Sequence, residues 1–267
     1  MVIRTISSQS NPTLKMIRSL QKRKYRELQG AFVIEGNKMV EEALEQAAEV
    51  ILILATHSNF ASKDEDWLIK LQRKSIKTYL VSKKIFASVS QTENPQGILA
   101  VVKKQESSWE RILGLSSDPF LLILDGIQDP GNLGTILRTA AAAGVSGVLL
   151  TTGTVDLYNE KVLRATMGSI FHLPMRQNVD PQELVDVCSR ERLPLILADP
   201  RSTRPYFHWD FTSRMALVIG NESTGPGEIL RMAATETVVI PMPGQLESLN
   251  AAVAAGILLF ERVRQSF

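Results

Sequence analysis

The sequence is poor in the residues that build disulfides and metal sites, with one cysteine and three histidines in 267 residues. A single thiol, Cys188, cannot form a disulfide within the chain and cannot build a cysteine-based metal site alone. The histidines, His57, His172 and His208, are scattered and lack the spacing of metal ligands. We therefore expect no internal disulfide and no required metal.

Long hydrophobic runs are also missing. No apolar stretch approaches the roughly 18 residues that a membrane-spanning helix needs. The first residues, MVIRTISSQSNP, have no apolar signal core. We therefore expect an intracellular, cytoplasmic protein without a membrane partner.

Common nucleotide-binding and hydrolase signatures are absent as well. No G-x-G-x-x-G follows a predicted strand, and no G-x-x-x-x-G-K-[ST] occurs. No G-x-S-x-G elbow is present either. These absences disfavour dinucleotide-dependent, P-loop and serine hydrolase chemistry.

The net charge is only +2, but the charge is unevenly distributed. Residues 1–30 have seven Lys or Arg against one Glu, whereas residues 118–267 have twelve basic and sixteen acidic residues. Lys15, Arg18, Lys22 and Arg26 follow helical spacing in the first segment. A basic stripe of this kind favours contact with phosphates and the release of their counterions, and the alternative is a solvated helix face.

Alternating strand and helix patterns predict an α/β fold with a mostly parallel sheet. Residues 1–103 form a small α/β unit, residues 104–117 lose the alternation and predict a linker, and residues 118–267 resume it. In the last segment, continuous apolar runs such as LLILD and ALVIG are typical of buried parallel strands.

Three predicted strands of the last segment end in loops rich in glycine, proline and polar residues: LDGIQDPGNLGTILRTA, VIGNESTGPGEIL and IPMPGQLESLNAAVA. Ligands of parallel sheets bind beyond such strand ends. Each polar residue also has a structural explanation, since Asn132 and Ser248 are placed to cap helices. Arg138 on the Ala-rich helix is either paired structurally or reaches into a site.

Together, and in this order, the three loops resemble motifs 1, 2 and 3 of the SpoU (TrmH-like) RNA ribose 2′-O-methyltransferases of the SPOUT superfamily. The resemblance covers about 150 residues, and KVLRATMGSIFHLP is similar to the family's intervening segment. FVIEGNKMVEEAL and VSQTENPQGILAVV in residues 1–103 are similar to the small RNA-binding domain that precedes the catalytic domain in many members.

The resemblance implies a C-terminal trefoil knot, S-adenosylmethionine as methyl donor, a homodimer and structured RNA as substrate, with ribosomal RNA favoured over transfer RNA. It assigns catalytic roles by position to Arg138, Asn132, Glu222, Ser248 and Asn250. It assigns cofactor contacts to Gly220, Ile240, Leu249 and Asp199. Because a guanidinium stays protonated, we expect Arg138 to bind a phosphate or the developing alkoxide rather than to act as a base.

Three alternatives remain open at this point. The chain could methylate transfer RNA, or be a catalytically silent RNA-binding or ribosome assembly factor of the same fold. A nicotinamide-dependent enzyme of doubly wound type is the third, and titration with S-adenosylmethionine against NAD separates it from the leading interpretation.

Overall fold

The computed structural model describes residues 3–46, 48–114, 116–244 and 248–267, and its chain divides into two compact units. Unit 1 comprises residues 1–105 and 158–171, and unit 2 comprises residues 106–157 and 172–267. Residue 115 of the predicted linker and residues 245–247 of the third loop lie outside the described residues. In the described part of the chain, no helix is long and apolar enough to cross a membrane.

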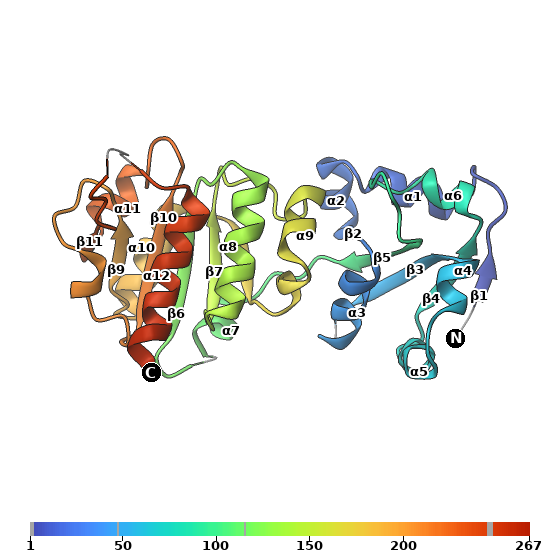
Figure 1. The fold of residues 1–267 in the computed structure, drawn as a ribbon, viewed down its shortest axis with the longest axis horizontal. Coiled ribbons are helices and arrows are strands. Elements are labelled where there is room, and N and C mark those ends of the chain that lie inside the picture. The colour runs from blue at the N-terminus through green and yellow to red at the C-terminus, as the bar shows by residue number, and fades with distance from the viewer. Residues whose placement is uncertain (1–2, 47, 115, 245–247) are drawn as a thin grey trace. The chain divides into compact units, whose positions relative to one another are not determined.

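Unit 1 is built on a five-stranded mixed sheet in the order β1-β4-β3-β5-β2 (Figure 1). The strands are β1 (Ile3–Thr5), β2 (Ala31–Glu35), β3 (Val50–Thr56), β4 (Lys77–Val81) and β5 (Ile98–Lys103). Strand β5 runs antiparallel to both β2 and β3, whereas β1, β3 and β4 are parallel. The helices are α1 (Pro12–Ser19), α2 (Arg23–Gln29), α3 (Asn37–Glu45), α4 (His57–Ala61), α5 (Glu65–Arg73) and α6 (Lys83–Ala87).

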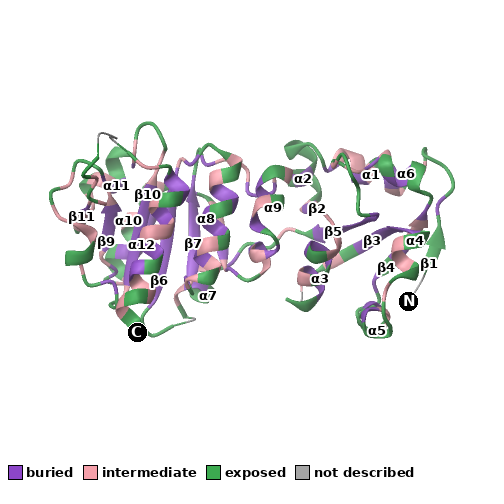
Figure 2. Cartoon of the chain, in the orientation of Figure 1, coloured by how far each residue is buried: buried purple, intermediate pink, exposed green. Residues whose placement is uncertain are grey.

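Unit 2 contains a fully parallel six-stranded sheet in the order β11-β9-β10-β6-β7-β8. Its strands are β6 (Phe120–Asp125), β7 (Gly147–Thr151), β8 (Met175–Val179), β9 (Leu195–Ala198), β10 (Met215–Gly220) and β11 (Glu236–Val238). Its helices are α7 (Trp109–Gly114), α8 (Pro130–Ala142), α10 (Pro181–Arg190), α11 (Glu228–Met232) and α12 (Ala251–Ser266), with a 3-10 turn η2 (Tyr206–His208). The central strands are buried, as continuous apolar runs predict (Figure 2). The predicted α/β fold with a parallel sheet flanked by helices is confirmed.

A segment from the middle of the C-terminal half packs in unit 1. It contains α9 (Glu160–Thr166) and the 3-10 turn η1 (Ser169–Phe171). The ring of Tyr158 lies 4.4 Å from that of Phe32 on β2, and the Tyr158 hydroxyl donates to the carbonyl oxygen of Gln105. Gly168 is close to Glu42, and a Cβ there would lie 2.6 Å from the Glu42 Cγ. The predicted boundaries had placed all of residues 118–267 in one domain.

The segment predicted as a linker, residues 104–117, contains the helix α7. Ile112 of this helix is completely buried in the core of unit 2, against the sheet. A Cβ on Gly147 would lie only 2.7 Å from the Ile112 Cγ2. The first residue of β7 is a glycine, and its missing side chain leaves room for Ile112. The serine-rich composition of residues 104–117 predicted a linker, although Ile112 in this segment belongs to the core of unit 2.

The basic stripe differs from its sequence pattern. Lys15 and Lys22 are exposed, but Arg26 is buried and its guanidinium donates to the carbonyl oxygens of Leu20 and Gln21. Arg18 donates to Ser88 and to the carbonyl oxygen of Gln9. Arg26 is therefore buried against backbone acceptors of unit 1, which stands against its assignment to RNA contact, whereas the contacts expected of Lys15, Arg18 and Lys22 stay predictions.

Candidate active site

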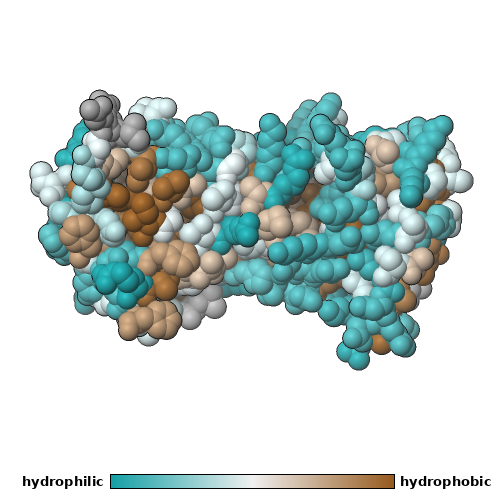
Figure 3. Space-filling view, viewed as in Figure 1, coloured by the Kyte–Doolittle hydropathy of each residue, from teal (hydrophilic) through white to brown (hydrophobic). Residues whose placement is uncertain are grey.

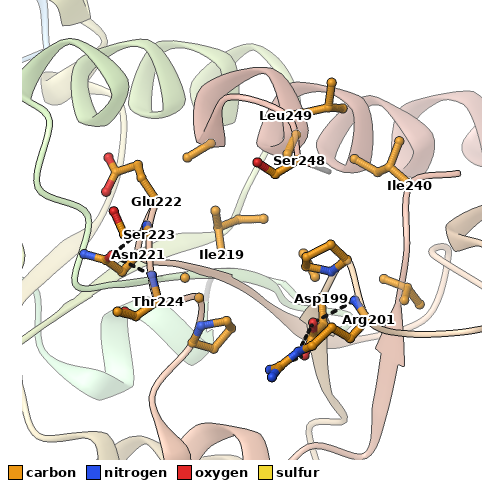
Figure 4. A pocket seen from close by; sticks show the side chains of 18 of the residues that line it. Asp199, Arg201, Ile219, Asn221, Glu222, Ser223, Thr224, Ile240, Ser248 and Leu249 are labelled. Carbon is orange, nitrogen blue, oxygen red and sulfur yellow. Dashed lines mark hydrogen bonds and ion pairs between the residues drawn. The ribbon is translucent and has the colours of Figure 1, made fainter. Parts of the chain in front are cut away.

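The candidate site lies at the carboxyl ends of four neighbouring strands of unit 2. Because these strands are parallel, the segments following β6, β9, β10 and β11 emerge at one edge of the sheet. Three of these segments surround a cavity of about 410 Å³ (Figure 4). Its lining includes Asp199, Arg201, Gly220, Glu222, Arg231, Ile240, Met242, Ser248 and Leu249.

The loop after β6 is tied down through the buried carboxylate of Asp125. This side chain accepts hydrogen bonds from the Thr151 hydroxyl and from the backbone N–H of Gly227, both at 2.7 Å. Gly126 then turns the chain with φ +69°, a conformation that favours glycine. The Asn221 side-chain amide donates to the Gly126 carbonyl oxygen at 2.7 Å. The first and second loops are therefore held together by direct hydrogen bonds.

Glu222 joins the second loop to the start of α8. Its carboxylate accepts from the backbone N–H groups of Gln128 and Asp129 and from Asn132 Nδ2 at 3.0 Å. Burial would raise the pKa of Glu222, but the hydrogen bond from Asn132 and those from the backbone outweigh it and lower the pKa. A carboxylate satisfied in this way is a poor proton acceptor at neutral pH.

A hydrogen-bond chain connects all three loops. Asn250 Nδ2 donates to Asn132 Oδ1 at 2.8 Å, and Asn132 Nδ2 donates to Glu222. The ionised Glu222 can only accept, so the Asn132 amide must present its nitrogen to Glu222 and its oxygen to Asn250. Asn250 in turn accepts from the N–H groups of Ala252 and Val253, which fixes its own orientation. The three residues fix one another's positions.

The predicted caps are replaced by neighbouring residues. Asp129, not Asn132, caps α8 by accepting from the Asn132 N–H. Asn250, not Ser248, caps α12. Asn132 and Ser248 therefore do not cap these helices, and Ser248 lines the cavity.

Gly220 lies where β10 meets the returning loop. A Cβ on this residue would lie 2.1 Å from the backbone nitrogen of Pro226 and 2.3 Å from the carbonyl carbon of Gly225. Only a residue without a side chain permits this approach, which shapes one wall of the cavity. Ile240 and Leu249 contribute apolar surface from the third segment.

The structure places two predicted residues differently. Arg138 is exposed on α8, does not line the cavity, and has no hydrogen-bond or ion-pair partner among the described residues. The Asp199 carboxylate lines the cavity, but it is hydrogen-bonded to Arg201 and Arg231. Sequence reasoning missed Arg231, because a basic residue in the last turn of a helix has an ordinary explanation in the helix dipole.

Cys188 does not line the cavity. Burial raises the pKa of the Cys188 thiol to about 12, which makes it a structural, unreactive group. Within the described ranges, no group of three or more His, Cys, Asp or Glu side chains is arranged to hold a metal ion.

We expect the substitution Glu222→Gln to change how stability depends on pH. The carboxylate has a lowered pKa in the folded protein, so its contribution is fully present above the unfolded-state pKa of about 4.3 and is lost as the pH falls through the folded-state value. The difference in free energy of unfolding between wild type and variant should be constant above about pH 6 and shrink below about pH 4. Urea titrations across this range measure it, and the control is Glu228→Gln on α11, whose carboxylate has no hydrogen-bond or ion-pair partner among the described residues. A difference that persists unchanged into acid contradicts the assignment.

Comparison with known proteins agrees with this geometry. The profile of the SpoU rRNA Methylase family matches residues 119–260, and that of the MRM3-like substrate binding domain matches residues 11–100. The 23S rRNA (guanosine(2553)-2'-O)-methyltransferase RlmP of Bacillus subtilis is 36% identical over 97% of this chain and 98% of its own. An uncharacterised tRNA/rRNA methyltransferase of Synechocystis is 35% identical over 99% of this chain and 95% of its own.

Among solved structures, an AdoMet-bound rRNA methyltransferase from Sinorhizobium meliloti superposes with a TM-score of 0.87 at 29% identity. The superposition covers 99% of both chains. The similarity therefore extends over both units as well as the three loops.

Proposed function

Since the chain belongs to the SpoU rRNA methylase family, as its three motifs predicted, we propose that it transfers a methyl group from S-adenosylmethionine to a ribose 2′-hydroxyl of ribosomal RNA. The observation that carries the proposal is the convergence of the second and third motif loops on one cavity, with the first loop joined to them by the hydrogen-bond chain Asn250–Asn132–Glu222.

The cavity suits the methyl donor in size and chemistry. Its volume of about 410 Å³ lies within the range of about 300–1,000 Å³ of small-molecule sites. Ile240 and Leu249 offer apolar surface for an adenine ring, and the backbone of Gly220, packed against Gly225 and Pro226, forms part of the cavity wall. Glu222 provides negative charge near a sulfonium. When bound, the donor supplies an electrophilic methyl group on that sulfonium.

The protein's own task is to position and activate the 2′-oxygen, which is a weak acid. Asn132 and Asn250 lie at the junction of the loops and would orient the ribose, while Ser248 lines the cavity beside them. Glu222, already satisfied by three donors, keeps this arrangement in place rather than taking the proton. Arg138 would bind the neighbouring phosphate or the developing alkoxide and so lower the pKa of the hydroxyl.

We further propose that the loops of unit 2 form a trefoil knot. The resemblance of the three loops to the motifs of the SpoU family, which implies such a knot, supports this proposal. The knot would keep the walls of the cofactor cavity rigid.

The substrate is proposed to contact unit 1, whose residues match a substrate-binding domain. The exposed Lys15 and Lys22, with the neighbouring Arg23 and Lys24, are the side chains of this segment available to phosphates. Arg18 and Arg26 would hold this segment in place through their hydrogen bonds to Ser88 and to the carbonyl oxygens of Leu20 and Gln21. A cytoplasmic location is also proposed, because the proposed substrate is ribosomal RNA.

A homodimer is proposed through the exposed face of α12 and α8. Val253 and Phe260 on α12 are 52% and 47% exposed, and hydrophobic atoms gather over this helix in Figure 3. Arg138 lies on the exposed stripe of α8, the helix that packs beside α12. In a dimer formed through these helices, Arg138 would reach the cavity of the partner protomer, which explains its separation from its own.

We expect Phe260→Glu to convert the dimer to a monomer without unfolding it. In a twofold interface each protomer loses the buried apolar surface of its Phe260, so the substitution acts twice. We therefore expect the dimer dissociation constant to rise by about 10²- to 10⁴-fold. Sedimentation velocity measures the mass, and Met232→Glu, at an 81% exposed position on α11, is the matched control. A variant that keeps the dimer mass contradicts this interface.

The proposed function is tested with labelled S-adenosylmethionine and ribosomal RNA from a strain that lacks the enzyme. Label should enter the RNA and remain, after alkaline hydrolysis, in alkali-resistant dinucleotides, because a 2′-O-methyl group blocks cleavage at that ribose. Label in transfer RNA alone would overturn the ribosomal assignment. No transfer to any RNA would point to a binding or assembly factor.

A further inference from the structure

Arg231 of α11 connects two walls of the cavity. Its Nη1 donates to the carboxylate of Asp199, which follows β9, and its Nη2 donates to the carbonyl oxygen of Pro226 at 3.2 Å. Pro226 belongs to the loop after β10. Asp199, Pro226 and Arg231 all line the cavity.

The Asp199 carboxylate has no acceptor site left for a ligand. Oδ1 accepts from the backbone N–H and the Nε of Arg201, and Oδ2 accepts from Arg201 Nη2 and Arg231 Nη1. A carboxylate offers about four acceptor sites, and these four hydrogen bonds fill them. The side chain is also only 7% exposed. Asp199 is therefore an anchor for the two arginines rather than a contact for the bound molecule.

The Asp199 carboxylate stays ionised at neutral pH. Burial would raise the pKa of Asp199, but hydrogen bonds from Arg201 and the charge of Arg231 outweigh it and lower the pKa. The guanidinium also lies against the turn at Gly225, whose φ is +70°, and a Cβ there would be 3.3 Å from Arg231 Nη2. The arginine therefore contacts the loop at Gly225, where the positive φ strains any residue that has a side chain.

We infer that Asp199 and Arg231 form a positioning bridge that holds the loop of residues 221–227 against the end of β9 and so sets the width of the cofactor cavity. The inference rests on the proposed function. Figure 4 shows Asp199 and Arg201 at a distance from Glu222 and Ser248, where the methyl group must be delivered. The bridge therefore supports the part of S-adenosylmethionine remote from the methyl group, and acts on cofactor affinity rather than on the chemical step.

The test is the affinity of Arg231→Gln for S-adenosylmethionine, measured by calorimetric titration of the full chain. The variant leaves Asp199 paired with Arg201, so no buried charge is abandoned. We expect its Kd to rise about 10-fold or more, with kcat at saturating cofactor and the KM for RNA within about twofold of wild type. Arg231→Lys can satisfy one of the two acceptors, so its Kd for S-adenosylmethionine should lie between those of wild type and Arg231→Gln.

The control is Arg204→Gln, which breaks the 2.5 Å ion pair with Glu236 on β11 outside the cavity lining. It should leave the Kd unchanged. If wild type binds no S-adenosylmethionine, the proposed function fails. If wild type binds but Arg231→Gln binds equally well, or loses kcat with unchanged Kd, the bridge is overturned. Should Arg231→Gln not fold, Arg231→Lys and Asp199→Asn decide by the same measurement, with wild-type affinity in both as the contradicting result.

Discussion

Replacing Arg138 with alanine is expected to lower kcat for methyl transfer by about 10²- to 10³-fold, the usual effect of removing one group that stabilises developing charge. The Kd for S-adenosylmethionine should not change, because the proposed contact of Arg138 is with the phosphate or ribose oxygen of the RNA and not with the cofactor. Its side chain is exposed and without a partner among the described residues, so the substitution removes no internal contact. Single-turnover methylation of ribosomal RNA, with cofactor binding measured in parallel, separates the two quantities.

The variant Arg138→Lys refines the same prediction. Lysine keeps the positive charge but loses the planar fork that pairs with a phosphate, so we expect partial activity. Arg190→Ala, at an exposed position on α10, is the control for general loss of positive charge. Near-normal methylation by Arg138→Ala would remove Arg138 from the active site.

The second large effect is expected from Gly220→Ala. The added Cβ would lie 2.1 Å from the nitrogen of Pro226, and side-chain adjustment cannot relieve a clash with backbone. The loop must shift by the order of 1 Å, a displacement that is known to cost about 10²-fold in function. We expect the affinity for S-adenosylmethionine to fall by at least that factor, measured by calorimetric titration alongside the melting temperature.

Two further variants make the Gly220 prediction specific. Gly244→Ala is the control, because a Cβ there meets no atom of the described residues within 4 Å. Pro226→Ala added to Gly220→Ala removes the proline ring but not the backbone nitrogen, so it should not restore binding. A double variant with wild-type affinity would show that the ring alone makes the contact.

The parallel sheet could be predicted because its strands are buried on both faces and therefore read as apolar runs. LLILD and ALVIG became β6 and β10 within one residue at each end. The starts of α8 and α12 were less predictable. Asp129 and Asn250 cap these helices, although Asn132 and Ser248 have equally suitable side chains, and tertiary hydrogen bonds decide between such neighbours.

The candidate site was predictable in its loops but not in its pairings. Strand ends of a parallel sheet must meet, so the convergence of Gly220, Glu222 and Ser248 follows from topology. The partners of a guanidinium do not follow from spacing. Arg26 is used by backbone carbonyls and Arg231 by a carboxylate 32 residues away, while Arg138 remains exposed, and the three are indistinguishable in sequence.

The return of residues 158–171 to unit 1 has a consequence for how the two units can be inherited. The chain crosses between them three times, after residues 105, 157 and 171. A catalytic half transplanted without its companion would carry Tyr158, Val162 and Leu163 as buried residues with nothing to bury them. Gene rearrangement could not exchange either half as a module unless this insert changed with it. An exchange of units therefore also requires new contacts for residues 158–171.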